Sequence, residues 1–176
     1  MVKTNTYIHL LFYLIIVSCG RNTYEKMSRK TNPDSLTESL VNANRMHVKR
    51  QSDEIDQYVK NHNWQMNVTG TGLRYMIYKN GSGEHALQGK YAKINYKISL
   101  LDGTECYSSI KTGPREFLIG QDHVESGLHE GILLMNVGDK ALFILPSYMA
   151  HGLHGDENKI PPMAIIVYDI ELLSLR

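Results

Sequence analysis

Hydrophobic and polar residues alternate along several stretches of the chain from about residue 69 onward. The clearest stretch is 93–100, where apolar residues occupy every second position from Ile94 to Leu100 and polar residues lie between them. This period of two predicts a half-buried β-strand. Asp102-Gly103 follows directly and predicts a hairpin turn. Shorter alternation over 73–78 predicts another strand.

The C-terminal part of the chain continues this strand-rich pattern around a single helical stretch. Residues 141–145 are continuously apolar, as in a strand covered on both faces, and apolar residues occupy every second position of 164–172. Between them, 126–135 has apolar residues enough for one short helix, which we expect Gly138 to close. These elements predict an α+β domain over 69–176, a twisted antiparallel β-sheet wrapped around one short helix.

The residues before this domain have a different pattern, which predicts a helical extension over 34–68. Pro33 suits a first helical turn, and Ser35 with Glu38 resembles a capping box. A second helical segment is expected from Ser52. We expect a helix or helix pair that packs on the domain or on a second copy, forming a homodimer, or else a partly solvated linker helix.

The first 19 residues have the pattern of an export signal. Lys3 precedes an apolar run from Ile8 to Val17 that is too short to span a bilayer, and small residues flank Cys19. This resembles a bacterial lipoprotein signal over 1–19, in which Cys19 becomes the lipidated first residue and anchors the chain to a membrane. The alternative is a plain signal peptide with an incidental cysteine. Polar residues 20–33 are expected to form a flexible tether, and we expect a periplasm-facing protein of the cell envelope.

Composition narrows the classes of partner and cofactor. Lys and Arg total 19 against 18 for Asp and Glu, so no basic excess exists to neutralise a nucleic-acid backbone, and no nucleic-acid partner is expected. The 2 cysteines form neither a disulfide-dense scaffold nor a zinc pattern. A His-rich stretch with His151, His154, Asp156 and Glu157 offers metal-ligand types, but no fourth ligand has suitable spacing, so we expect a solvated polar loop.

An ordered set of short motifs carries a family resemblance over essentially all of 69–176. The stretches are Thr71-Gly72-Leu73-Arg74-Tyr75, Ile94-Asn95-Tyr96, Leu101-Asp102-Gly103-Thr104, Pro114-x-x-Phe117-x-Ile119-Gly120, Val124-x-x-Gly127-x-x-Glu130-Gly131, Met135-x-x-Gly138-Asp139-Lys140, Ile160-Pro161-Pro162 and Tyr168-Asp169-Ile170-Glu171-Leu172. With them, the domain resembles the FKBP-type peptidyl-prolyl cis-trans isomerases. The run Phe143-Ile144-Leu145-Pro146-Ser147-Tyr148, with Gly155-Asp156-Glu157-Asn158-Lys159, is similar within that family to the lipoproteins of gliding bacteria named for motility and their relatives.

The resemblance implies a prolyl isomerase that acts on proline-containing polypeptide segments and needs no cofactor or metal. It also implies that the backbone N–H at Glu125 donates to ligand carbonyls. The substrate pocket that it implies is formed by Tyr96, Cys106, Tyr107, Phe117, Val124, Glu125, Leu128, His151, Ile160 and Tyr168.

Several of these positions depart from the family's residues. The family has Phe-Asp where this chain has Cys106-Tyr107, an aliphatic residue at Glu125, Trp at Leu128 and Tyr at His151; Arg115 also replaces an apolar residue. We expect a shallower and wetter pocket, with Tyr107 turned inward in part of the missing Trp volume. The alternative function is a binding module of an envelope machine that holds proline segments without converting them. Cys106 is expected to be a small buried hydrophobe rather than a nucleophile.

Overall fold

The computed structural model describes residues 33–176, and the signal, Cys19 and most of the tether expected from the sequence lie outside them. The helical extension is one continuous helix, α2 (Pro33–Asn61), rather than a helix pair. The elements that follow are β1 (Asn67–Val68), β2 (Arg74–Lys79), β3 (Tyr91–Leu100), β4 (Glu105–Ser108), α3 (Ser109–Thr112), β5 (Arg115–Leu118), α4 (Ser126–Ile132), β6 (Lys140–Leu145), the 3₁₀ helix η1 (Ser147–Met149) and β7 (Ile166–Leu175).

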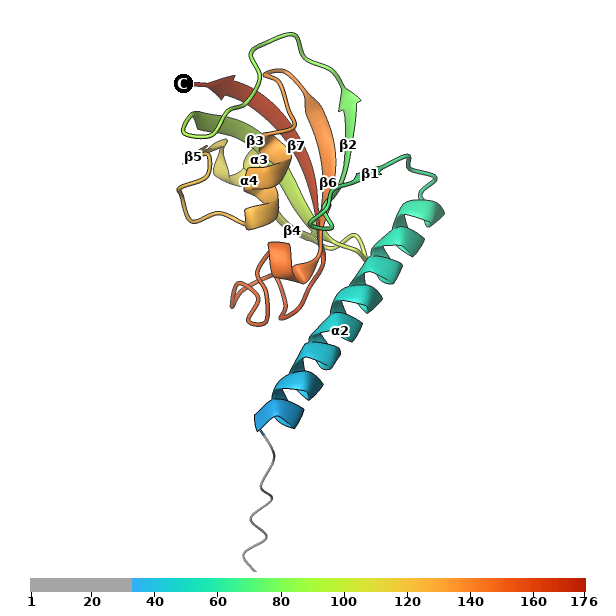
Figure 1. Ribbon diagram of the computed structural model, residues 1–176. Helices are drawn as coiled ribbons and strands as arrows, with labels where there is room; N and C mark the ends of the chain where they lie inside the picture. Colours follow the sequence, from blue (N-terminus) through green and yellow to red (C-terminus); the bar gives the residue numbers. More distant parts are fainter. Residues whose placement is uncertain (1–32) are drawn as a thin grey trace, which may run out of the picture. The chain divides into compact units, whose positions relative to one another are not determined.

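All strands join one antiparallel sheet, in the order β1-β2-β6-β7-β3-β4, and β5 also pairs with β3. The hairpin expected at Asp102-Gly103 joins β3 to β4, and β4 and β5 lie along different parts of β3. The short helix α4 lies against one face of this sheet (Figure 1). The predicted α+β class, with an antiparallel sheet, one short helix across it and an N-terminal helix, is therefore confirmed.

The principal core lies between α4 and the sheet. Leu128 and Ile132 of α4 are fully buried with Phe143 of β6 and Tyr168 of β7. A Cβ built at Gly131 would lie 2.4 Å from the ring of Phe143, so this glycine allows the helix backbone to approach the strand closely. This close packing holds α4 against β6, beside the cavity described below.

The opposite face of the sheet forms a second, smaller core with α2. Ile55 is fully buried and packs with Ile144, Ile165 and Val167, and Trp64 packs at its margin. The apolar run 141–145 is thus covered on both faces, as its sequence predicts. From Ser39 onward, α2 belongs to the same compact unit as the sheet.

Two local features differ from the sequence pattern. Arg74, a polar position of the alternating stretch, is only 5% exposed, because its guanidinium donates to Asp56 Oδ1 at 2.7 Å and to Ser52 Oγ at 2.7 Å, both on α2. Helix α4 ends at Ile132, earlier than Gly138, which instead has φ +93° in the turn before β6.

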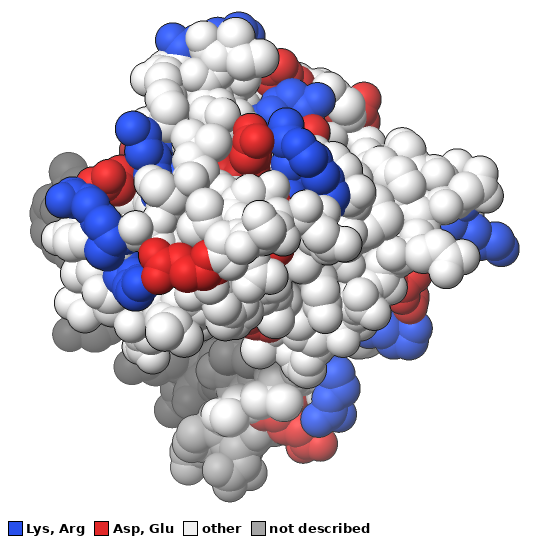
Figure 2. All heavy atoms as spheres, turned by 90° about the horizontal axis from the view of Figure 1, so that it is seen from above, with Lys and Arg blue, Asp and Glu red and all other residues white. Residues whose placement is uncertain are grey.

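The surface has mixed charge. On the face in Figure 2, acidic and basic side chains lie beside one another. The ion pairs of the described residues include Arg176–Glu116 and Lys140–Glu171, the second of which links β6 to β7. Within residues 33–176, no helix combines the length and apolarity that a membrane crossing requires.

Candidate functional site

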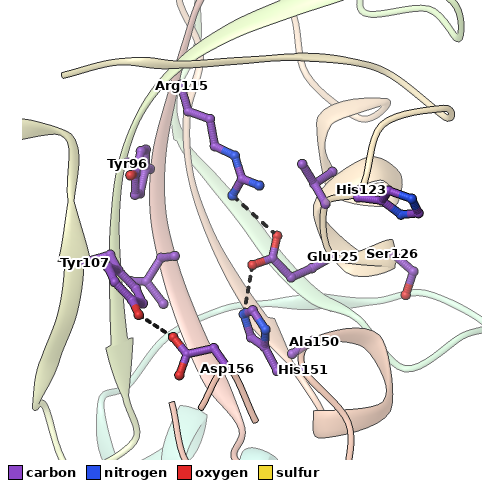
Figure 3. Close-up of a pocket in the computed structure, with 11 residues that line it drawn as sticks. Tyr96, Tyr107, Arg115, His123, Glu125, Ser126, Ala150, His151 and Asp156 are labelled. Atoms are coloured by element: carbon purple, nitrogen blue, oxygen red, sulfur yellow. Dashed lines mark hydrogen bonds and ion pairs between the residues drawn. The ribbon is translucent and has the colours of Figure 1, made fainter. Parts of the chain in front are cut away.

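A cavity of about 610 Å³ opens between the edge of the sheet, the start of α4 and the long connection from β6 to β7 (Figure 3). Strands β3, β4 and β5 supply one side, the segment 123–126 supplies the second, and residues 150–156 supply the third. Its lining residues are Tyr96, Ile98, Tyr107, Arg115, His123, Val124, Glu125, Ser126, Ala150, His151 and Asp156.

The structure brings half of the sequence-predicted pocket residues to the cavity surface. Those that line it are Tyr96, Tyr107, Val124, Glu125 and His151. The others are buried in the principal core: Cys106, Phe117, Leu128, Ile160 and Tyr168. The core position of Cys106 agrees with its interpretation as a buried hydrophobe, and burial raises the pKa of its thiol. A substrate role for any member of the predicted set stays a prediction.

The most unusual feature of the cavity is a buried carboxylate. Glu125 is 7% exposed and stands at the N-cap of α4. Its Oε1 lies 3.0 Å from His151 Nε2, and its Oε2 lies 3.8 Å from Arg115 Nη1. Neither contact has hydrogen-bond geometry, so Glu125 Oε2 and His151 Nε2 are buried without a hydrogen-bond partner. The attraction of the Arg115 guanidinium at this distance offsets only part of the cost of removing the carboxylate from water.

Tyr168 lies beneath this cluster and shares its incomplete bonding. The residue is 1% exposed, and its hydroxyl has no hydrogen-bond partner. Burial, followed by the nearby Glu125 carboxylate, raises the pKa of Tyr168 well above its ordinary value. The hydroxyl therefore stays neutral, and it lies buried in the core near the Glu125 carboxylate without a hydrogen bond of good geometry.

A second carboxylate is fully bonded. The hydroxyl of Tyr107 donates to Asp156 Oδ2, while the backbone N–H groups of Asn158 and Ile160 donate to Oδ1 at 3.0 and 2.7 Å. Partial burial opposes ionisation, but these hydrogen bonds outweigh it and lower the pKa of Asp156 to about 2. Asp156 therefore orders the loop before Ile160 and holds the Tyr107 ring at the cavity wall, as Figure 3 shows.

Tyr96 is fixed at both its backbone and its hydroxyl. Its N–H donates to Ser109 Oγ at 3.0 Å, and its Oη lies 3.1 Å from Thr112 Oγ1, where either hydroxyl can donate. On the opposite side of the cavity, the hydrogen bonds of the described residues include none donated by the backbone N–H of Glu125. The cavity thus presents aromatic walls and an available backbone donor.

Sequence reasoning missed part of the lining. The alternating pattern puts Ile98 on the buried face of its strand but not in the pocket, and Ser126 and Ala150 are not among the predicted pocket residues. Asp156 is predicted only as one of the metal-ligand residue types of a polar loop, and His123 lies outside the predicted pocket residues. Within residues 33–176, no group of three or more His, Cys, Asp or Glu side chains is arranged to hold a metal ion.

Comparison with known proteins places this geometry in a family. The family described as FKBP-type peptidyl-prolyl cis-trans isomerase matches residues 82–173. The chain is 41% identical over 109 residues to the FKBP-type peptidyl-prolyl cis-trans isomerase FkpA of Aeromonas hydrophila, covering 61% of this chain and 40% of that protein. It is 32% identical over 111 residues to the FKBP-type 22 kDa peptidyl-prolyl cis-trans isomerase of Escherichia coli, covering 62% of this chain and 53% of the relative.

Solved structures give the same result for the fold. AtFKBP13 superposes with a TM-score of 0.61 at 29% identity, covering 64% of this chain and 99% of that one. FkpA from Escherichia coli has a TM-score of 0.63 at 24% identity, covering 99% of this chain and 84% of the other, and supports the fold alone. Because the matched family segment spans most of the sheet, α4 and the cavity, the chain belongs to the FKBP-type peptidyl-prolyl cis-trans isomerase family.

Proposed function

We propose that this chain is a peptidyl-prolyl cis-trans isomerase that acts on proline-containing polypeptide segments in the cavity beside Tyr96. The observation that carries the proposal is the cavity itself, with aromatic walls and a free backbone donor at Glu125, in a chain of this family. The chain covers 40% of the length of the FkpA relative, so the activity is inferred from the site rather than from that whole protein.

The chemistry requires little from the protein. Rotation about an X-Pro bond is opposed by amide resonance, with a barrier of about 18–20 kcal/mol. The twisted amide has lost this resonance and is less polar than the planar one, so a cavity that excludes water favours it. The free N–H of Glu125 is available to donate to a substrate carbonyl and fix the peptide while it rotates. Each 1.4 kcal/mol or so of preferential stabilisation gives about a tenfold gain in rate.

The charged residues of the cavity set the expected level of activity. Glu125, Arg115 and His151 form a polar cluster where an apolar surface would desolvate the amide best. Leu128 is buried in the core and has no aromatic ring, whereas the resemblance implies a Trp at this position. We therefore expect slower isomerisation than in family members whose cavity has the Trp floor. We also expect weak binding of the macrolide inhibitors of the family.

The second candidate function is a binding module, and the Glu125 cluster is the observation that favours it. A cavity that holds a proline segment through hydrogen bonds to its buried polar atoms does not need to favour the twisted amide. Binding and turnover are therefore separate properties of this cavity and require separate measurements.

We further propose that the protein is a lipid-anchored, periplasm-facing member of the family, related to the gliding-motility lipoproteins. The support is the resemblance of residues 1–19, ending at Cys19, to a lipoprotein signal. Homodimer formation through the helical extension is supported by the exposed apolar residues Leu40, Val41 and Met46 on α2, which are 51–74% exposed.

The test uses residues 20–176 and a short proline peptide observed by NMR. Amide shifts of Val124 and Glu125 on titration report binding, and exchange between the cis and trans peptide signals reports turnover. We expect both in the parent chain, loss of turnover in Tyr96→Ala, and faster turnover in Leu128→Trp. Amide shifts without cis/trans exchange would favour the binding module. The absence of both the shifts and the exchange would refute both functions.

A further inference from the structure

The third side of the cavity belongs to the long connection between β6 and β7, residues 146–165. His151 and Asp156 both lie between the end of β6 at Leu145 and the start of β7 at Ile166. Apart from η1 this connection has no regular secondary structure, and connections of this length hold one conformation only when other groups fix them. Asp156 orders the part near Ile160, but its hydrogen bonds do not reach the two ends of the connection.

Both ends are bound by one side chain of α2. Gln51 is 3% exposed, and its Oε1 accepts hydrogen bonds from the N–H and the Oγ of Ser147, each at 3.0 Å. Its Nε2 donates to the carbonyl of Met163 at 2.8 Å. A single amide thus joins the start of the connection to its end. Buried glutamines are uncommon and are generally bonded to defined partners, as this one is.

Further backbone bonds connect this amide to the cavity wall. Met163 N–H donates to the carbonyl of Gly152 at 2.8 Å, and Gly152 N–H donates to the carbonyl of Ser147 at 2.8 Å. Gly152 directly follows His151, whose ring faces Glu125 across the cavity. Met163 itself has φ +59°, a conformation that costs a non-glycine residue energy and persists only where neighbouring bonds impose it.

We propose that Gln51 is a positioning residue for the cavity: through Ser147 and Met163, helix α2 sets the conformation of residues 146–165 and so the placement of His151. The helical extension is then part of the binding site's framework as well as a spacer. The consequence for catalysis rests on the proposed isomerase function, whereas the effect on the connection does not.

The apolar contacts of α2 do not explain this arrangement. Ile55 and the second core contact the connection only at its last residue, Ile165, and include none of residues 146–152. The neighbouring Ser52 of α2 also forms a hydrogen bond to the rest of the domain, but its Oγ accepts from Arg74 of β2 rather than from the connection. Ser52→Ala therefore removes a comparable polar contact of the same helix and is the matched control.

The test measures amide hydrogen exchange residue by residue in the full chain. In Gln51→Leu we expect the Ser147, Gly152 and Met163 amides to exchange about tenfold faster, equivalent to about 1.4 kcal/mol, while β6 and β7 amides keep their protection. Gln51→Glu keeps an acceptor for Ser147 but cannot donate to Met163. It should therefore speed exchange at Met163 and Gly152 alone, and it provides a second variant if Gln51→Leu folds poorly.

Two results would overturn the proposal. One is unchanged protection of all three amides in both Gln51 variants, and the other is an equal effect of Ser52→Ala on them. With a proline peptide, the Gln51 variants should raise KM about tenfold and leave kcat within about twofold, as expected for a displaced binding wall. If the parent chain has no isomerase activity, the proposed function fails while the exchange pattern still decides the role of Gln51.

Discussion

The hydroxyl of Tyr168 gives the sharpest prediction about stability. The hydroxyl is buried, at 1% exposure of the residue, and has no hydrogen bond of good geometry. Oε2 of the neighbouring Glu125 carboxylate also has none. An unsatisfied buried polar group costs about 1–3 kcal/mol. Tyr168→Phe removes that group and keeps the ring that fills the core, so it should raise the free energy of unfolding by about 1–2 kcal/mol. In a chain of this size that corresponds to a rise in Tm of about 2–8 °C.

The matched control is the same chemical change at Tyr107. That hydroxyl donates to the ionised Asp156, and hydrogen bonds to charged groups contribute about 1.5–3 kcal/mol, so Tyr107→Phe should destabilise. Urea unfolding of the parent and both variants at neutral pH measures the two effects directly. A gain of stability in Tyr168→Phe together with a loss in Tyr107→Phe would support the assignment of the Tyr168 hydroxyl as unbonded. A loss of stability in Tyr168→Phe would refute it, because it would show that Tyr168 donates a hydrogen bond to Glu125.

Three further predictions follow from particular contacts. Gly131→Ala should lower stability by about 1–3 kcal/mol in urea unfolding, because its Cβ would overlap the Phe143 ring; an unchanged midpoint would contradict this close packing. The folded-state pKa of Asp156, about 2, lies below its ordinary value, so its contribution to stability is complete above about pH 4 and disappears as pH falls through 2; an Asp156→Asn variant should converge with the parent in that window, and a constant difference down to pH 2 would contradict the assignment. In a Cys19→Ser variant, Cys106 should resist a thiol reagent until the chain unfolds, since the thiol is buried and its pKa is raised; rapid labelling of the folded chain would show an accessible nucleophile.

The strands and the short helix could be predicted because their signals are local. A period of two over 93–100 and over 164–172 reports one buried face of a strand, and the structure places β3 and β7 there. The predicted end of the helix at Gly138 is wrong. The helix ends at Ile132, where residues 133–136 turn back, and the positive φ of Gly138 serves the next turn.

The cavity could be predicted only in part, because its electrostatics depends on distant segments. The resemblance located Glu125 and His151, and it identified Arg115 as a departure at the rim. Their contacts join three different elements and have no pattern along the chain. The contacts of Asp156 also could not be predicted, because its side-chain donor, Tyr107, lies 49 positions earlier in the sequence.

The role of Gln51 had no signal in the sequence. Glutamine in a helix with a thin apolar stripe is ordinarily solvent-exposed. Its burial becomes visible only when Ser147, 96 positions later, and Met163 are placed beside it. Arg74 gives the same lesson, because its position in an alternating strand predicted exposure, whereas Asp56 and Ser52 of α2 bury it.

The most direct test of the account is the rate of cis/trans exchange in short X-Pro peptides with and without the parent chain. Uncatalysed exchange takes tens to hundreds of seconds, so even about a tenfold acceleration is easily measured. We expect acceleration that saturates with increasing peptide concentration and that a proline-containing competitor suppresses. Exchange at the uncatalysed rate across a series of residues before proline would contradict the claim that this cavity catalyses prolyl isomerisation.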